Sequence, residues 1–200
     1  MDGKGPLRIP ALPPNAPGRG NALSRALGRW TLRLGGWRID GELPDVLRCV
    51  IIVAPHTSNW DFVWGLATKL ALGLQVDWIG KHTLFRFPFG FLLRRLGGIP
   101  VARHAPGDIV ERIAQQVKER RQVFLGLSPE GTRRKVERWK TGFHRIAMVA
   151  SVPIFPVALD YSARCVRLFP LYQATGDYQT DLHALQRHFH AGMALKPNGY

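Results

Sequence analysis

The sequence predicts a single α/β domain, in which helices flank a mainly parallel sheet, with a basic amphipathic helix at its N-terminal side. Three observations support this. A chain of 200 residues is long enough for one domain with a core and short of two full ones. From residue 47 onward, short apolar runs alternate with longer segments of helical periodicity, as in βαβ units. The hydrophobic share of 46% and charged share of 21% are ordinary for a globular chain.

The first 46 residues divide into a tail and a helix with its linker. Residues 1–20 are rich in Pro and Gly and lack periodicity, so we expect a flexible tail. Within residues 21–46, apolar side chains recur at three- and four-residue steps with arginines between them, which predicts a basic amphipathic helix over 21–39. Its apolar positions are Leu23, Leu27, Trp30, Leu34 and Trp37. Two environments stay open for this helix, a membrane surface and the protein's own core.

Residues 47–200 are expected to form the main domain. Continuous or β-branched apolar runs predict strands at residues 47–54, 76–80, 99–103, 122–128 and 152–161, with 164–171 as a further candidate. Helical periodicity and end signals predict helices at residues 58–74, 89–96, 106–121, 140–151 and 178–194. Because ligands of open parallel sheets bind where strands end and helices begin, the residues at these junctions are the candidates for function.

Charge narrows the choice of partner. A net charge of +14 favours an anionic one: nucleic acid, anionic lipid headgroups, an acyl carrier protein or the phosphates of coenzyme A. Cys49 and Cys165 have no metal-like spacing and are read as buried free thiols. The most apolar stretch, residues 62–76, is interrupted by Lys69 and is too short to span a bilayer. We expect neither a signal peptide nor a spanning helix, so membrane contact would come from the surface.

The first junction carries a His and an Asp five residues apart. His56 leaves the first predicted strand, and Asp61 lies in the first turn of the following helix. A carboxylate there could accept the Nδ1 proton of the imidazole and leave Nε2 free as a base. A second interpretation stays open, since Ser58 and Asp61 also resemble a capping box at the start of the helix.

The next junctions are basic. The segment Ser128-Pro129-Glu130-Gly131-Thr132-Arg133 follows the fourth predicted strand, and further cations come after it. Lys81 follows the second strand and Arg103 the third. Basic residues after three successive strands would line one edge of the sheet, an arrangement that suits a phosphate.

These motifs together resemble a known family. HTSNWD, GKHTLFRFPFGFLLRRLGGIPVAR, SPEGTR and VPIFPVAL occur in the order and rough spacing of the four blocks of the glycerolipid acyltransferases, which include the 1-acylglycerol-3-phosphate acyltransferases. The resemblance covers residues 47–160, and its specificity comes mainly from His-x4-Asp paired with Glu-Gly-Thr-Arg.

The resemblance implies roles for the quoted residues. His56 would deprotonate the acceptor hydroxyl and Asp61 would orient it, so that the acceptor attacks an acyl thioester on coenzyme A or acyl carrier protein. Arg133 would hold an acceptor phosphate with Arg103 and Lys81 assisting, and Glu130, Gly131 and Thr132 would shape the acceptor site.

The same resemblance implies the partners. No metal and no cofactor is expected besides the acyl-CoA or acyl carrier protein that donates the acyl group. The acceptor would be a lysolipid, with lysophosphatidate as the default, and the protein would act peripherally on the anionic, cytoplasmic face of a membrane. The chain departs from the family in its shorter, less apolar N-terminal region and its short insert between the second and third blocks.

Three points stay open. A basic nucleic-acid-binding module would explain the arginines, although it leaves His56 and Asp61 unexplained and no RNA-binding or zinc motif is found. An inactive membrane scaffold of the same fold is the other alternative. An apolar cluster between the second and third strands fits core packing, or a lipid-facing patch if part of it is exposed; its members are Phe85, Phe87, Phe89, Phe91, Leu92 and Leu93.

Overall fold

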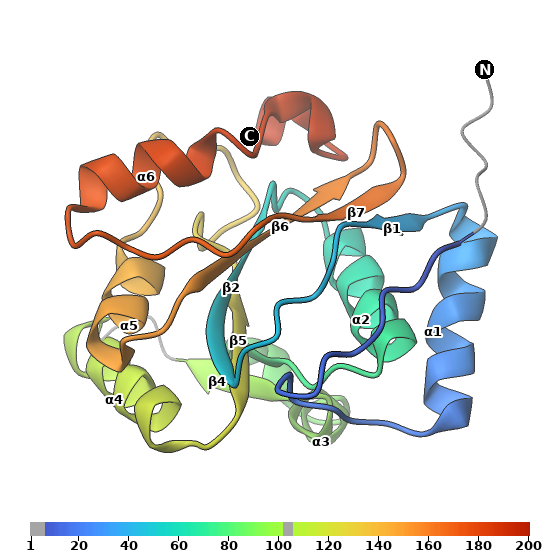
Figure 1. Ribbon diagram of the computed structural model, residues 1–200. Coiled ribbons are helices and arrows are strands. Elements are labelled where there is room, and N and C mark those ends of the chain that lie inside the picture. Colours follow the sequence, from blue (N-terminus) through green and yellow to red (C-terminus); the bar gives the residue numbers. More distant parts are fainter. Residues whose placement is uncertain (1–6, 102–105) are drawn as a thin grey trace.

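A seven-stranded sheet with helices on both faces forms the body of the protein (Figure 1). The computed structural model describes residues 7–101 and 106–200. The strand order is β1-β7-β6-β2-β5-β3-β4. All neighbouring strands run parallel except β6 and β7. The predicted fold class, a single α/β domain with a mainly parallel sheet, is confirmed.

The strands coincide with the predicted apolar runs, with one addition at the N-terminal side. They are β1 (Arg38–Asp40), β2 (Arg48–Ala54), β3 (Asp77–Lys81), β4 (Gly98–Val101), β5 (Val123–Leu127), β6 (Ile154–Asp160) and β7 (Cys165–Leu168). The candidate run at 164–171 therefore does contain a strand.

The helices connect these strands. They are α1 (Ala22–Gly35), α2 (Trp60–Leu72), α3 (Gly90–Arg95), α4 (Pro106–Glu119), α5 (Gly142–Ala150) and α6 (Tyr178–Gln186), with short 3-10 turns η1 (His82–Phe85), η2 (Ala191–Met193) and η3 (Pro197–Gly199). The last predicted helix, 178–194, is too long: α6 ends at Gln186, and the chain continues through Arg187 into an irregular segment.

Alternate residues of the central strand face two separate cores. Val50, Ile52 and Ala54 of β2 pack with apolar side chains of α4, α5 and α6. Cys49 and Ile51 face the opposite side, where α1 and α2 cover the sheet. Figure 1 shows the same division. Burial on both faces explains why the strands read as continuous apolar runs, as expected of a parallel sheet.

The amphipathic helix ends earlier than predicted. Its last residue is Gly35, because Gly36 adopts the left-handed conformation and caps it, and the chain then enters β1. Gly28 weakens an isolated helix but is needed here, since a Cβ on it would come 2.4 Å from the Ala71 backbone nitrogen of α2. The helix thus packs on α2 through Gly28 and Leu32, while most of the predicted apolar stripe points away from the core.

The prediction of a flexible tail over residues 1–20 is wrong for residues 7–20. Ala16 is 4% exposed and packs in the core beneath α1 and α2. The backbone amide of Arg19 donates to the Gly73 carbonyl, and that of Gln75 donates to Pro17. Backbone hydrogen bonds and a few apolar side chains can still fix a Pro-rich segment that lacks periodicity. Hydrophobic periodicity in the sequence does not reveal such contacts.

No helix within 7–101 and 106–200 combines the length and apolar character that crossing a bilayer would require.

Candidate active site

Four neighbouring strands deliver polar residues to one edge of the sheet. β6, β2, β5 and β3 lie side by side and run parallel, so their carboxyl ends meet. Tyr161 follows β6, His56 follows β2, the Ser128–Arg133 segment follows β5, and Lys81 ends β3. The sheet therefore gathers at this edge most of the residues that the sequence singled out.

The side chains of His56 and Asp61 are in contact across the turn that leads from β2 into α2. Their Nδ1 and Oδ2 atoms are 3.1 Å apart. The imidazole side chain is 28% exposed, whereas the carboxylate is 2% exposed. Because the loop folds back over the first turn of α2, a separation of five residues brings the two side chains together as the spacing predicted.

Asp61 is held by several donors at once. Its Oδ2 accepts the backbone N–H groups of Thr57 and Ser58, each at 2.8 Å. Its Oδ1 accepts the hydroxyl of Tyr161 at 2.6 Å. A buried carboxylate with this many donors is fixed in orientation.

The capping interpretation of this segment is met in part. The assigned cap residue of α2 is Asn59, which makes no side-chain cap hydrogen bond. The Ser58 hydroxyl nevertheless accepts the Trp60 amide at 3.2 Å, and Asp61 accepts the Ser58 amide, as in a capping arrangement. Asp61 also bonds Thr57 and Tyr161, so it ties the start of α2 to the loop that carries His56.

This arrangement leaves one nitrogen of His56 available. With the Nδ1 proton donated to Asp61, the Nε2 atom carries the lone pair, and a partly exposed imidazole can present it to a ligand at the sheet edge. A base oriented by a carboxylate is the geometry needed to take a proton from a hydroxyl group.

Glu130 supports the same loop from the neighbouring strand. Its two carboxyl oxygens both lie 3.1 Å from the His56 backbone nitrogen, which donates to them, and the residue is 1% exposed. Burial raises the pKa of the Glu130 carboxyl from 4.5 to about 7, against the opposing effect of the His56 hydrogen bond. The structure thus places Glu130 behind His56.

The rest of the turn after β5 is open and basic. Gly131 has a φ of 65°, in the left-handed region that favours glycine. Thr132 accepts the Arg134 amide at 3.4 Å, and the Arg133 side chain is exposed. The cations that follow are also exposed: Arg134, Lys135, Arg138 and Lys140.

Two further predicted cations have different outcomes. Lys81 is the last residue of β3 and is exposed at the same edge of the sheet. Arg103 lies outside the described residues. Arg145, the last cation of the basic run, is in an ion pair with Glu111 of α4, away from the turn.

The C-terminal segment borders the site, which the sequence did not predict. The Lys196 amide donates to the Thr57 hydroxyl at 3.3 Å. A cavity of about 150 Å³ lies between this segment and the turn after β5; its lining is Glu130, Val136, Glu137, Trp139, Gln186, Gly199 and Tyr200. Burial, followed by the charge of Glu130, raises the pKa of Tyr200 to about 12. No sequence pattern links residue 196 to residue 57, so only the fold reveals this contact.

Apolar side chains are exposed on α1, on the segment after β3 and at the start of α2. On α1 the predicted stripe is open, with Leu23 at 77% and Leu34 at 68% exposure, and arginines lie beside it. After β3, the apolar cluster turns its side chains outward, with Phe87 97% exposed; Phe89, Phe91 and Leu92 are exposed as well. Trp60, next to Asp61 in the chain, is also exposed. Of the apolar cluster, Phe85 alone is buried.

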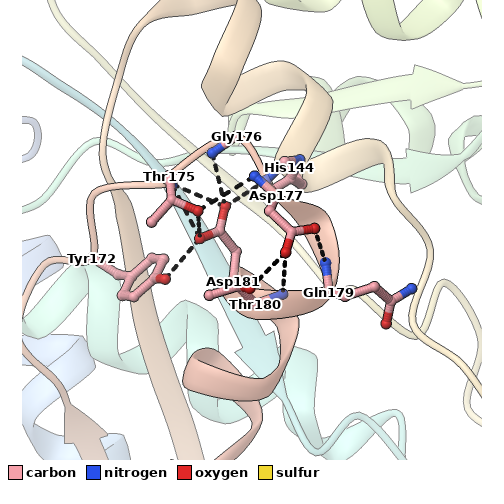
Figure 2. A network of polar contacts seen from close by, with 8 residues as sticks. All are labelled: His144, Tyr172, Thr175, Gly176, Asp177, Gln179, Thr180 and Asp181. Carbon is pink, nitrogen blue, oxygen red and sulfur yellow. Dashed lines mark hydrogen bonds and ion pairs between the residues drawn. The ribbon is translucent and has the colours of Figure 1, made fainter.

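A second His–Asp pair lies between α5 and α6, away from the strand ends (Figure 2). His144 Nε2 is 2.7 Å from Asp181 Oδ2, and the two side chains are 7% and 0% exposed. Tyr172 and Thr175 donate their hydroxyl groups to Asp181 at 2.7 and 2.8 Å. Burial alone would raise the pKa of the Asp181 carboxyl, but the hydrogen bonds from Thr175, Tyr172 and His144 lower it overall.

Among the residues that the structure describes, no group of three or more His, Cys, Asp or Glu side chains converges as metal ligands would.

Comparison with known proteins places this site in context. Residues 42–160 match the family model described as Acyltransferase. Three curated relatives are named 1-acyl-sn-glycerol-3-phosphate acyltransferase. That of Escherichia coli (strain K12) is 32% identical over 130 residues, which is 61% of this chain and 51% of the relative. That of Salmonella typhimurium is 32% identical over 124 residues, 59% of this chain and 49% of the relative. That of Streptococcus pneumoniae is 30% identical over 131 residues, 60% of this chain and 48% of the relative.

The chain spans about half the length of these curated relatives. A solved structure, that of the 1-acyl-sn-glycerophosphate (LPA) acyltransferase PlsC from Thermotoga maritima, has the same fold. The TM-score is 0.58 at 17% identity, over 83% of this chain and 76% of the other.

Proposed function

Because the chain belongs to the acyltransferase family, we propose that the protein is an O-acyltransferase that moves a fatty acyl group from a thioester to the hydroxyl of a lysolipid. The observation that carries the proposal is the His56–Asp61 pair at the sheet edge, with a free Nε2 beside an open basic turn.

The reaction follows from that geometry. Nε2 of His56 removes the proton of the acceptor hydroxyl as its oxygen attacks the thioester carbonyl carbon. Asp61 stabilises the imidazolium that forms, since its Oδ2 lies 3.1 Å from Nδ1. The tetrahedral intermediate then expels the thiolate, which takes the proton from Nε2. The C–S bond breaks, an ester C–O bond forms, and His56 returns to its starting state.

The acceptor site is proposed at the turn after β5. Arg133 is exposed in this turn, three residues after Glu130, whose carboxyl holds the His56 backbone. A phosphate on Arg133 would then bind at the same end of the strands as the base. Gly131 and Thr132 shape the turn, and Lys81 at the end of β3 adds positive charge to the same edge. An acceptor with a phosphate fits this charge, and the curated relatives' name points to lysophosphatidate as the first candidate.

The acyl donor is proposed to be acyl-CoA or an acyl-loaded carrier protein. Both are anionic, and both suit a chain of net charge +14. No further cofactor enters the scheme, since the His–Asp pair and the two substrates account for every bond made and broken.

We also propose that the protein works peripherally on the cytoplasmic, anionic face of a membrane. The exposed stripe of α1, flanked by Arg25, Arg29 and Arg33, supports this, because apolar and basic side chains side by side suit an anionic lipid surface. Co-sedimentation with phosphatidylglycerol vesicles tests it. A Trp30→Ala variant should bind less than wild type, and equal binding would contradict the assignment of α1.

The test of the activity is thiol release from a long-chain acyl-CoA with a panel of lysolipids. Acceptor-dependent release by the wild type that disappears in His56→Ala is the expected result. His183→Ala is the matched control, because it removes an exposed imidazole from α6 away from the strand ends. Repeating the assay with acyl carrier protein separates the two donors, and absence of release with both would contradict the proposal.

A further inference from the structure

We propose that Tyr161 is a positioning residue for the His56–Asp61 pair and that Trp37 holds its ring in place. This inference rests on the proposed function. It adds Tyr161 to the pair, a residue that lies 100 positions after Asp61 in the chain.

The hydrogen bond itself is short and specific. The Tyr161 hydroxyl donates to Oδ1 of Asp61 at 2.6 Å, the oxygen that does not face His56. The other oxygen, Oδ2, receives His56 Nδ1 and two backbone amides. The two oxygens therefore have separate tasks, and Tyr161 fixes the rotation of the carboxylate about its Cβ–Cγ bond so that Oδ2 stays directed at the imidazole.

The phenol is well placed to act as a permanent donor. Burial, followed by the hydrogen bond and charge of Asp61, raises the pKa of Tyr161. The hydroxyl consequently keeps its proton over the pH range in which a His base works. Asp61 cannot lose this donor by titration of Tyr161.

Both the backbone and the ring of Tyr161 are held in place. Tyr161 follows β6 directly, next to β2 in the sheet, and its backbone amide donates to the Met193 carbonyl at 2.9 Å. The ring contacts Trp37 edge to face, with centroids 4.9 Å apart and planes at 87°. Trp37 is 4% exposed and stacks on Trp64 of α2 at 4.9 Å. An aromatic wall between α1 and α2 thus supports the donor to Asp61.

A positioning role makes a kinetic prediction that packing alone does not. Loss of the hydroxyl in Tyr161→Phe should lower kcat about 10-fold and leave the acceptor KM within about twofold, because Asp61 acts on the base and not on the acceptor. The acid limb of the pH–rate profile should move to higher pH, since a carboxylate with one donor fewer holds the imidazolium proton more strongly. Glu130 is the other titrating group near His56, so the profile is measured in Glu130→Gln as well.

Tyr172→Phe is the matched control. It removes the same kind of bond, a tyrosine hydroxyl to a buried aspartate, from the second His–Asp pair. It should change the melting temperature and leave kcat and the pH profile as in wild type. If Tyr161→Phe behaves in the same way as Tyr172→Phe, the positioning role is wrong.

A second variant tests the support from Trp37. Trp37→Leu should lower kcat in the wild-type background and have little further effect in Tyr161→Phe, because its influence passes through the phenol. Additive effects would overturn the role of Trp37. His56→Ala, measured alongside, separates the two levels of inference. Transfer that persists in His56→Ala refutes the proposed function, whereas transfer that needs His56 and ignores Tyr161 refutes the positioning role alone.

Discussion

Two His–Asp–Tyr clusters occur within residues 7–101 and 106–200, and they differ in where they lie. At the strand ends, His56 pairs with Asp61, which accepts a hydroxyl from Tyr161. Between α5 and α6, His144 pairs with Asp181, which accepts a hydroxyl from Tyr172. Both carboxylates are almost fully buried and both also accept backbone amides. The chemistry of the two clusters is therefore nearly the same.

What separates them is access to the imidazole. The His56 side chain is four times as exposed as that of His144, at 28% against 7%. His56 follows a parallel strand at the edge where ligands bind, whereas His144 lies within the first turn of a helix that packs against the core. A His–Asp pair is thus a candidate catalyst or a structural tie depending on whether a substrate can reach its second nitrogen.

The largest expected effect comes from removing the two imidazoles in turn. His56→Ala should lower acyl transfer about 10³-fold, since a general base contributes about 10²–10⁴-fold. Its melting temperature should stay near that of wild type, because the side chain is partly exposed. His144→Ala should do the reverse, lowering the melting temperature with little effect on kcat of the folded fraction. Equal loss of transfer per folded molecule in both variants would remove the distinction between the clusters.

The aspartates should follow the same division with a smaller effect. Asp181→Asn should destabilise the fold by about 3 kcal/mol, as expected when a buried pair loses one charge. For a chain of this size that lowers Tm by about 6–12 °C. Asp61→Asn should instead cut kcat about 10²-fold. Calorimetry and the thiol assay on both variants test this, and a purely thermal effect of Asp61→Asn would show that Asp61 only organises the loop.

The sequence predicted the His56–Asp61 pair, but it missed both Tyr161 and the second cluster, for a physical reason. His56 and Asp61 are five residues apart at a strand–helix junction, so local geometry alone brings them together. Asp181 is 37 residues from His144, and Tyr161 is 100 residues from Asp61. The first contact forms because α6 packs on α5, and the second because β6 lies beside β2. Hydrophobic periodicity in the sequence predicts neither contact.

The fold shows the same limit. Apolar runs predicted six strands, because burial on both faces leaves a continuous signal. The predicted helix extended into the three-residue edge strand β1, because Trp37 continues the apolar periodicity of α1. Trp37 in fact lies beyond the helix and contacts Tyr161. Residues 7–20 were misjudged because their order depends on partners such as Gly73, far along the chain.

The pH dependence of stability should differ in sign between the two regions. Glu130, behind His56, has a pKa raised from 4.5 to about 7. Between those values the folded state keeps a proton that the unfolded state has lost, so stability falls as pH rises. The loss should be on the order of 2 kcal/mol and should disappear in Glu130→Gln. Asp181, with a lowered pKa, contributes stability that is lost only as pH falls below its ordinary value of 3.8. Chemical denaturation from about pH 2 to 8 measures both. A slope between pH 4.5 and 7 that is unchanged in Glu130→Gln would contradict the role given to Glu130.

The smallest expected effect concerns the cations near each cluster. Arg133 is exposed in the turn beside Glu130, whereas Arg187 is exposed just after α6, near Tyr172 of the buried cluster. Arg133→Ala should raise the KM for a phosphate-bearing acceptor about 10-fold with kcat little changed, because it removes binding common to ground and transition states. Arg187→Ala removes the same charge from the same chain and should leave KM as it is. If both variants raise the KM of the acceptor equally, acceptor binding responds to net charge alone. If Arg133→Ala raises the KM of phosphate-free acceptors to the same extent, the Arg133 side chain supports the turn and does not bind phosphate.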